Sequence, residues 1–298
     1  MRIIPVESIN SRVGDPKGFI EFSEEEYRCG VVDTALGIIK RKKPIVLITG
    51  PSGSGKTLTA HLLESELIKL GAKTRIISMD NYFISLKNGI DGIDLESPDR
   101  LDRALFREQS DKILLGQEVI LPVFNFTNQE RTDGEAFARE RDEIVIFEGI
   151  HALNPEVTGN LSENAGAVYV SVRTRIKGNN TLHPSKIRLM RRFVRDKLFR
   201  GRTLLQTMEF YANVERGEKL YIMPHKKNAQ FDIDTFIAYE PCVYKKHILA
   251  ELYAANGKHP IASELIAFLE ELEEIGDEFV PSCSLVREFI GGSSLMAH

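Results

Sequence analysis

The chain has 298 residues, enough to bury a sizeable hydrophobic core as one large domain or as one domain with extensions. Its 42% hydrophobic and 28% charged content is ordinary for a soluble globular protein, and a net charge of −4 disfavours a dedicated nucleic-acid binder. No apolar run approaches the roughly 18 residues that span a bilayer, and the N-terminus lacks the apolar core of a signal peptide. The three cysteines are far apart and show no metal-ligand spacing. We therefore expect a cytoplasmic protein with reduced thiols and no membrane partner.

Residues 1–42 precede the first motif with chemical meaning. Ser23 followed by three glutamates is the pattern of a helix cap and an acidic first turn, and it predicts a helix running from there towards Lys40. We derive no function for this segment.

Residues 50–57 fit G-x-x-x-x-G-K-[ST], the motif of a phosphate-binding P-loop. The flanking residues support more than a chance match, because 44–49 is a β-branched apolar run and 57–67 has apolar residues at helical spacing. Loop N–H groups and the helix N-terminus present positive partial charge to phosphates, Lys56 reaches the terminal phosphates, and Thr57 offers a hydroxyl to Mg²⁺. The predicted ATP-binding residues of the loop are Gly50, Ser52, Gly53, Ser54, Gly55, Lys56 and Thr57.

The next segments alternate between strand-like and helix-like patterns. Buried strands are predicted at 73–78, 143–147, 167–172 and 231–237, an extended segment at 119–124, a helix at 100–115 and a loop at 84–98. This alternation predicts an α/β fold, in which helices cover both faces of a parallel sheet. Ligands bind beyond the carboxyl ends of such strands, where Asp80, Glu148 and the P-loop all fall.

Residues 186–202 form a predicted basic helix, with eight lysines and arginines against one acid, Asp196. A charge run is usually a solvated helix face, but crowded positive charges repel one another unless an anion is bound. We therefore favour a phosphate-binding lid. Further on, Pro260 opens a predicted amphipathic helix over 261–272, whose apolar stripe must bury on the core or on another subunit. A homo-oligomer is thus left open.

The acids that accompany the P-loop indicate phosphoryl transfer to a hydroxyl. The chain has no Asn-Lys-x-Asp motif of a GTPase and no signature of an ABC ATPase. Asp80 is the candidate base, with a helix N-cap as its structural alternative. Glu148 could bind Mg²⁺ or be an ordinary acid at a strand end. Phe124 and Phe126 could stack on a base or fill the core, and His151 is expected to be structural.

Taken together, these motifs resemble the uridine kinase/phosphoribulokinase family of P-loop kinases. The resemblance spans about residues 44–240 and is strongest to bacterial uridine-kinase-like nucleoside kinases, whose C-terminal ending is similar to 285–292 here. Many of those kinases carry an N-terminal domain shared with threonyl-tRNA synthetases, and we expect this chain to lack it. The motifs that carry the resemblance are residues 50–57, 79–83, 97–99, 147–150 and 191–196.

The resemblance implies a five-stranded parallel kinase core and transfer of the ATP γ-phosphate to the 5′-hydroxyl of a nucleoside, with Mg²⁺. Asp80 matches the aspartate that takes the hydroxyl proton, and Glu148 matches the acid of the metal site, which Thr57 and Asp80 would share. Glu96 and Arg188 would hold the sugar. The lid arginines Arg191, Arg192 and Arg195 would close over the phosphates, with Arg192 catalytic beside Asp80 and Lys56.

The base pocket departs from the family pattern. Phe124 and Gln129 stand where uridine kinases have a tyrosine and a histidine, and Phe126 and Arg131 complete the expected substrate pocket. A glutamine amide both donates and accepts hydrogen bonds, so uridine or cytidine is expected and a purine nucleoside stays open. ATP rather than GTP as the donor is likewise an expectation.

The predicted organisation is an N-terminal extension over 1–42, a P-loop kinase domain over 43–245 and a helical C-terminal extension over 246–298. The expected partners are ATP and a nucleoside, with no nucleic acid. Two alternatives remain. One is a kinase of the same family for another small alcohol, such as a sugar phosphate or pantothenate. The other is a regulatory P-loop protein that binds nucleotide or RNA without catalysis.

Overall fold

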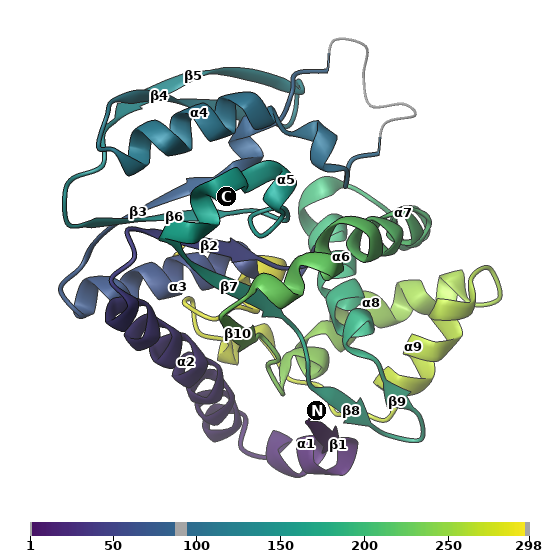
Figure 1. The fold of residues 1–298 in the computed structure, drawn as a ribbon. Helices are drawn as coiled ribbons and strands as arrows, with labels where there is room; N and C mark the ends of the chain where they lie inside the picture. Colours follow the sequence, from purple (N-terminus) through teal and green to yellow (C-terminus); the bar gives the residue numbers. More distant parts are fainter. Residues whose placement is uncertain (1, 87–93, 296–298) are drawn as a thin grey trace.

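A five-stranded parallel sheet lies at the centre of the computed structural model, which describes residues 2–86 and 94–295 (Figure 1). The strand order is β10-β7-β2-β6-β3. The strands are β2 (Ile45–Thr49), β3 (Lys73–Ser78), β6 (Glu143–Glu148), β7 (Ala165–Ser171) and β10 (Phe231–Asp234). The predicted α/β fold with a parallel five-stranded sheet is confirmed.

The order of the strands places the P-loop at the middle of the sheet. β2 pairs with β6 on one side and with β7 on the other, so the loop that follows β2 begins between the carboxyl ends of β6 and β7. β3 pairs with β6 in a register that sets Ser78 opposite Glu148. Parallel strands end at the same edge, so the residues after β2, β3 and β6 meet there.

Alternate residues of β2 face two different layers. Val46 and Ile48 belong to the larger hydrophobic cluster, which contains apolar residues of α2 (Pro16–Arg41), α3 (Lys56–Lys69), α6 (Pro184–Arg200) and α8 (Glu240–Ala255). Ile45 and Leu47 belong to a second cluster with α4 (Arg103–Leu114). Figure 1 shows α2 and α3 on one side of the sheet and α4 on the other. Because side chains alternate along a strand, the five buried residues of β2 direct their side chains to both faces of the sheet in turn.

Two smaller sheets lie outside the central one. β4 (Val119–Asn125) and β5 (Glu130–Phe137) form an antiparallel hairpin beside α4. β1 (Ile3–Pro5), β8 (Arg175–Lys177) and β9 (Thr181–Leu182) form the other. The sequence predicted the extended segment of β4 but not β5, because β5 is largely polar and exposed and has no apolar run.

The flanking segments share the main hydrophobic cluster with the central sheet. On the N-terminal side this applies to α1 (Val6–Val13) and α2; on the C-terminal side it applies to α9 (Pro260–Glu270), whose Leu265 and Leu269 are fully buried. The remaining helices are α5 (Pro155–Thr158), α7 (Leu204–Gly217) and α10 (Arg287–Ile290). In the part of the chain described, no helix is both long and apolar enough to cross a membrane. The division of the chain at residues 42 and 245 stays a prediction.

The predicted start of the long N-terminal helix is wrong. α2 begins at Pro16, and the Asp15 side chain accepts a hydrogen bond from the Gly18 N–H at 3.2 Å. Ser23 lies inside the helix, where its hydroxyl donates to the Phe19 carbonyl at 2.8 Å. Proline is favoured at the first helical position, so the Asp-Pro pair outweighs the Ser-Glu pattern further along. The predicted helix at 100–115 forms over Arg103–Leu114, and part of the loop predicted at 84–98 lies outside the described residues.

Candidate active site

The P-loop follows β2 with a backbone that requires glycine at several positions. Gly53 and Gly55 have φ angles of +75° and +82°, in the left-handed region that favours glycine. A Cβ atom on Gly50 would lie only 1.9 Å from the Val170 carbonyl oxygen. The loop can therefore wrap tightly over the end of β7, which leaves its N–H groups available to an anion.

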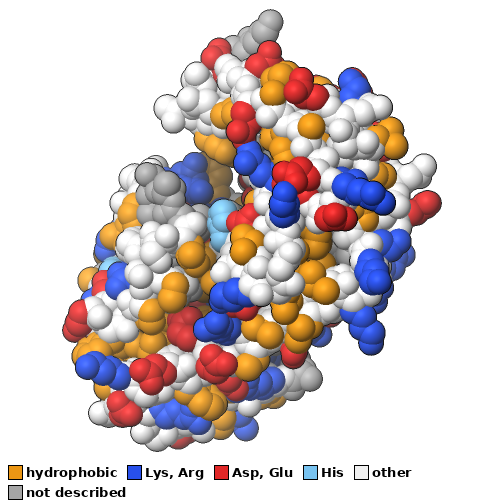
Figure 2. Space-filling view, turned by 90° about the vertical axis from the view of Figure 1, so that its left-hand side faces the viewer, with side chains coloured by type: hydrophobic (Ala, Val, Ile, Leu, Met, Phe, Trp, Pro, Cys, Tyr) orange, Lys and Arg blue, Asp and Glu red, His pale blue; other side chains and the backbone are white. Residues whose placement is uncertain are grey.

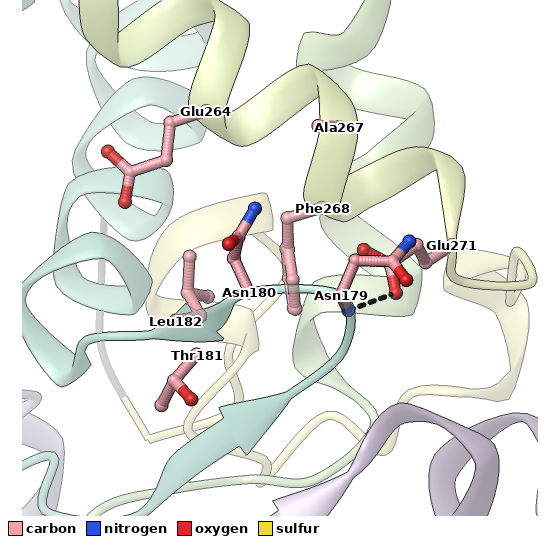
Figure 3. A pocket seen from close by; sticks show the side chains of 8 residues that line it. All are labelled: Asn179, Asn180, Thr181, Leu182, Glu264, Ala267, Phe268 and Glu271. Carbon is pink, nitrogen blue, oxygen red and sulfur yellow. Dashed lines mark hydrogen bonds between the residues drawn. The ribbon is translucent and has the colours of Figure 1, made fainter.

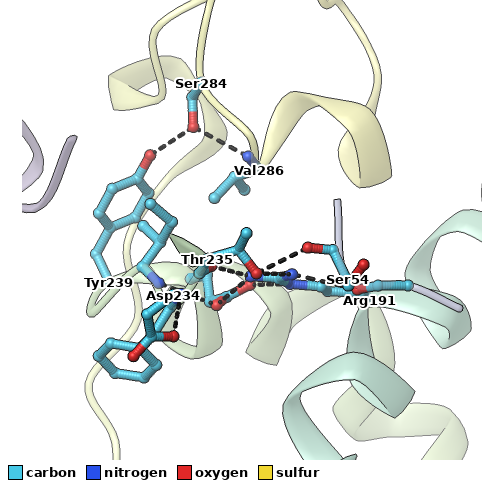
Figure 4. Close-up of polar contacts among 11 residues, drawn as sticks. Ser54, Arg191, Asp234, Thr235, Tyr239, Ser284 and Val286 are labelled. Atoms are coloured by element: carbon cyan, nitrogen blue, oxygen red, sulfur yellow. Dashed lines mark hydrogen bonds and ion pairs between the residues drawn. The ribbon is translucent and has the colours of Figure 1, made fainter. Parts of the chain in front are cut away.

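A buried polar cluster formed by Arg191, Thr235 and Glu240, here called the loop backing, contacts the carbonyl groups of the P-loop. Figure 4 shows Arg191 and Thr235 beside Ser54 of the loop. The Arg191 guanidinium donates from Nε and a terminal nitrogen to both carboxylate oxygens of Glu240, at 2.7 and 2.9 Å. It also donates to the Gly53 carbonyl at 3.2 Å, and the Thr235 hydroxyl donates to the Ser54 carbonyl at 2.7 Å. Burial opposes the charge of Arg191, but Glu240 outweighs it and the pKa of Arg191 is raised. The loop carbonyls thus have partners below the loop.

Two further arginines of α6 contact Ser52 at the tip of the P-loop. Arg188 donates to the Ser52 carbonyl at 2.9 Å and forms a bidentate ion pair with Glu218, at 2.6 and 2.8 Å. Arg192 donates to the Ser52 hydroxyl, and its Nε atom is buried without a hydrogen-bond partner. The pKa of Arg192 is lowered by burial and by the nearby charge of Arg195.

The arginine helix therefore divides into two groups. Arg188 and Arg191 are buried and neutralised by Glu218 and Glu240, two acids distant in the sequence. The prediction that these charges require a bound anion is wrong for Arg188 and Arg191. That prediction considered only the acids on the helix, whereas both carboxylate partners lie outside it. Among the described residues, Arg192 and Arg195 form no bidentate ion pair of this kind. Arg195 lies 3.6 Å from Asp196, which it shares with Arg200 and Arg202.

Three acids lie together at the carboxyl edge of the sheet. Asp80 is in the short helical turn after β3, and Glu148 ends β6 and accepts a hydrogen bond from the Ser78 hydroxyl at 3.0 Å. Burial, and then the charges of Glu148 and Glu96, raise the pKa of Asp80 to about 7, whereas Lys56 opposes the rise. A carboxylate with a pKa near neutrality can accept a proton from a hydroxyl at physiological pH.

The donor set at this edge fits Mg²⁺. Mg²⁺ is usually held by one or two carboxylates together with substrate phosphates and waters, so a cage of protein ligands is not needed. Among the described residues no group of three or more histidine, cysteine and acidic side chains could hold a metal alone. Asp80 and Glu148 are close enough for their charges to repel, and a cation would relieve that repulsion. Thr57, at the first turn of α3, supplies the hydroxyl.

We call the predicted substrate-binding residues Glu96, Phe126, Gln129 and Arg131, together with His151, the acceptor side. Glu96 packs against α7. A Cβ atom on Gly217 would lie 2.3 Å from the Glu96 Cβ, so the two segments touch. One carboxylate oxygen of Glu96 is buried without a hydrogen-bond partner, and burial raises the pKa of this residue, although Arg192 opposes the shift. Figure 2 shows the left-hand side of Figure 1, away from α7, where acidic and basic side chains are mixed over the surface.

Phenylalanines cluster where the base pocket was predicted, beside Arg100, which the sequence analysis did not select. The rings of Phe83, Phe124 and Phe126 meet edge to face, with centroids 5.1 to 6.1 Å apart. Phe124 is buried, but 57% of Phe126 is exposed, so a ligand could cover it. The Arg100 guanidinium lies 5.2 Å from the centroid of the Phe83 ring and donates to the Ile84 carbonyl.

The side chains of Gln129 and Arg131 already form hydrogen bonds within the protein. The Gln129 amide donates to the Phe126 carbonyl at 2.7 Å, and its oxygen accepts from Arg100 at 3.5 Å. Arg131 donates to Asp102 at 3.0 Å, and its other terminal nitrogen is buried without a partner. Gln129 could thus read a base only by exchanging these hydrogen bonds.

His151, which follows Glu148 in the chain, is buried and uncharged. Neither ring nitrogen makes a hydrogen bond of ordinary geometry, although the backbone of Glu96 is near enough to favour protonation. Burial outweighs that contact and lowers the pKa of His151 to about 4. The side chain packs edge to face with Tyr221, at 6.5 Å between ring centroids.

No sequence pattern indicated the contacts made by Glu218, Glu240 and Arg100. Glu218 is 30 residues from Arg188, and Glu240 is 49 residues from Arg191. Such pairs are invisible to local spacing rules. Arg100 follows the Pro98-Asp99 pair, but nothing in its spacing indicates that it reaches Phe83.

A separate small cavity lies between the β8–β9 turn and α9, away from these residues (Figure 3). Its volume is about 60 Å³, and Glu271 at its rim accepts a hydrogen bond from the Asn179 N–H at 2.9 Å. That volume is far below what a nucleotide needs, so this cavity is not a nucleotide site.

The comparisons with known proteins agree with this geometry. The model of the "Phosphoribulokinase / Uridine kinase family" matches residues 45–238. The chain belongs to this family. It is therefore a P-loop kinase, a phosphotransferase with an alcohol acceptor.

Several relatives are similar over most of their length. A uridine kinase of Borrelia duttonii is 32% identical over 193 residues, which cover 63% of this chain and 85% of the relative. A uridine kinase of Lactobacillus helveticus is 30% identical over 197 residues, which cover 64% and 86%. Among solved structures, a D-glycerate 3-kinase of Cryptococcus neoformans is similar with a TM-score of 0.44 and 16% identity, over 70% of this chain and 88% of that one. The family assignment rests on the sequence matches.

Proposed function

We propose that the protein is an ATP-dependent nucleoside kinase that transfers the γ-phosphate of ATP to the 5′-hydroxyl of a pyrimidine nucleoside. The observation that carries this proposal is the position of Asp80, a carboxylate of raised pKa near Lys56 and Glu148 at the edge of the sheet. The relatives named uridine kinase support the choice of acceptor.

On this proposal the P-loop holds the donor phosphates. Its N–H groups and Lys56 contact the phosphate oxygens. Arg192 and Arg195 of α6 supply further positive charge from the other side of the phosphates. The buried guanidinium of Arg191 acts differently from the lid role that the resemblance implies, because it contacts the Gly53 carbonyl beneath the loop. We assign it a positioning role.

Mg²⁺ would be held by Thr57, Glu148 and Asp80 together with phosphate oxygens, and it would neutralise charge on the transferring phosphoryl group. Asp80 accepts the proton of the acceptor hydroxyl as that oxygen attacks. Glu96 holds the sugar hydroxyls with its unpartnered oxygen, and the α7 contact fixes its backbone. Arg188, which is saturated by Glu218, orients the loop tip instead of the sugar.

The base would lie against Phe126, the exposed ring of the phenylalanine cluster. Stacking on an aromatic ring tolerates any base, so discrimination must come from polar groups around it. Arg100 and Gln129, already hydrogen-bonded to each other, are the polar pair nearest these rings. A pyrimidine carbonyl could accept from either side chain.

The first test is turnover of Mg·ATP with a panel of nucleosides, with ribulose 5-phosphate and pantothenate as controls. We expect uridine or cytidine to stimulate ADP formation, and nucleosides to exceed both controls. If a control is the better acceptor, the nucleoside assignment is wrong while the kinase class stands.

The second test is Asp80→Asn, which keeps the shape of the side chain and removes the base. We expect turnover to fall by at least about a hundredfold while ATP still binds, because the proton acceptor is lost and one Mg²⁺ ligand is weakened whereas the P-loop contacts remain. Binding is measured by titration calorimetry and turnover by ADP release. Near-normal turnover would remove Asp80 from the mechanism.

A further inference from the structure

The C-terminal segment Ser284–Gly291, here called the tail, lies directly against the P-loop. α10 within it packs on α6, and Leu285, Val286 and Phe289 are fully buried. A Cβ atom on Gly55 would lie 2.6 Å from a methyl carbon of Leu285. Leu285 therefore fills the space behind the glycine that precedes Lys56. That glycine also caps α3, so its position sets the direction in which the helix N-terminus points.

The tail also reaches the loop through the loop backing. The Phe289 ring lies 5.3 Å from the Arg191 guanidinium, which in turn donates to the Gly53 carbonyl. Ser284 hydrogen-bonds the Tyr239 hydroxyl at 2.9 Å and accepts from the Val286 N–H at 3.0 Å (Figure 4). Tyr239 immediately precedes Glu240, the acid that pairs with Arg191. The tail thus supports both left-handed glycines of the loop, Gly55 by direct contact and Gly53 through Arg191.

Glu288 brings a carboxylate of the tail within electrostatic range of the phosphate-binding cations. One of its oxygens is buried and has no hydrogen-bond partner among the described residues. Burial raises the pKa of Glu288, whereas Arg195, Arg191 and Lys56 oppose the shift. Two of these cations, Arg195 and Lys56, are the ones assigned above to the donor phosphates, so the tail borders the donor site itself.

We infer that the tail is a part of the donor site and that Leu285 is a positioning residue for the P-loop. Gly55 adopts its left-handed conformation readily because glycine has no side chain. For the same reason its backbone has more conformational freedom than that of any other residue. Packing by Leu285 removes that freedom and keeps the N–H groups of the loop directed at the phosphates. The inference rests on the proposed function only in taking residues 50–57 as the donor site, and it is independent of the acceptor.

The test compares Leu285→Ala with Leu269→Ala, a matched loss at another fully buried leucine, on α9. The probes are Mg·ATP and inorganic tripolyphosphate, titrated calorimetrically at a temperature where circular dichroism shows each variant folded. We expect Leu285→Ala to weaken both by about tenfold, since a small displacement of the loop affects every phosphate contact. Leu269→Ala and the volume-conserving Leu285→Met should stay within about twofold of the wild type.

Two results would overturn the inference: unchanged tripolyphosphate binding in Leu285→Ala, or an equal loss in Leu269→Ala. Should Leu285→Ala not fold, hydrogen exchange on the wild-type protein decides. Tripolyphosphate should slow exchange of amides in 284–291 more than in α9, and an unchanged rate in the tail would contradict the inference. Because no acceptor is present, failure of the nucleoside panel leaves these results intact, and failure here leaves the nucleoside assignment intact.

Discussion

The loop backing and the acceptor side differ in how fully their buried polar groups are paired. In the loop backing, Arg191 donates to Glu240, Thr235 and Gly53, and the Thr235 hydroxyl donates to Ser54. On the acceptor side, an oxygen of Glu96, a nitrogen of Arg131 and both nitrogens of His151 are buried and form no ordinary hydrogen bond within the described part of the chain.

This difference indicates that the backbone of the P-loop is held in one geometry before ligands arrive. Buried polar groups are costly unless paired, so a fully paired cluster holds one geometry. The phosphates of the donor need such a fixed cradle. Unpaired groups on the acceptor side are instead available to a ligand or to water, and their pairing on binding would add to specificity. The predictions below test the pairing on each side.

The largest effect is expected from Arg191→Met, which breaks the loop backing. The substitution leaves Glu240 buried with no cation, so the free energy of unfolding should fall by about 3 to 5 kcal/mol. Denaturation in urea measures the change. As a matched control, Arg200→Met on the same helix removes a half-exposed partner of Asp196 and should cost less than about 1 kcal/mol.

A loss below 1 kcal/mol for Arg191→Met would mean that Glu240 finds another partner or becomes protonated. The loop backing would then be no more fixed than the acceptor side, and the contrast between the two regions would fail.

The sequence predicted the parts of the fold and site that depend on local patterns. Buried strands such as β2 and β6 are mostly apolar runs. Glu148 ends β6 and Asp80 lies just after the end of β3, so their meeting at one edge could be inferred. The P-loop is likewise a contiguous motif with a strand before it and a helix after it.

What the sequence did not predict depends on contacts between distant segments. Spacing rules suggested a lid for the whole arginine helix, whereas Glu218 and Glu240 lie beyond that helix and hold Arg188 and Arg191 inside the protein. The engagement of Gln129 with Arg100 is of the same kind. Pairing over such distances is a property of the fold, and no local propensity encodes it.

A smaller effect is expected from the pH dependence of stability at His151. Its pKa is about 4 in the folded protein against 6.5 for an ordinary histidine, so the unfolded chain binds more protons between those values. The stability that the neutral imidazole contributes is thus complete above about pH 6.5 and is lost as the pH falls towards 4. This loss should amount to about 2 to 3 kcal/mol.

His151→Leu removes this titration while keeping the position apolar. We expect the free energy of unfolding of the variant to fall less than that of the wild type between pH 7 and pH 4.5, with carboxylates common to both cancelling in the difference. Equal losses would show that His151 is paired or hydrated in solution, so the acceptor side would hold fewer unpaired groups than the structure indicates.

The smallest effect is expected from Phe126→Ala, which alters the acceptor side alone. Stacking of a base on an exposed aromatic ring contributes about 1 to 3 kcal/mol, so KM for the nucleoside should rise by roughly tenfold. KM for ATP should stay within about twofold, because Phe126 belongs to the turn between β4 and β5 and not to the P-loop or the loop backing. Steady-state kinetics with each substrate varied in turn gives both values. Phe22→Ala removes a ring of similar exposure on α2 and should change neither. If instead the two KM values rise together, the β4–β5 hairpin and the P-loop respond as one unit, and the donor half of the site is not formed independently of the acceptor half.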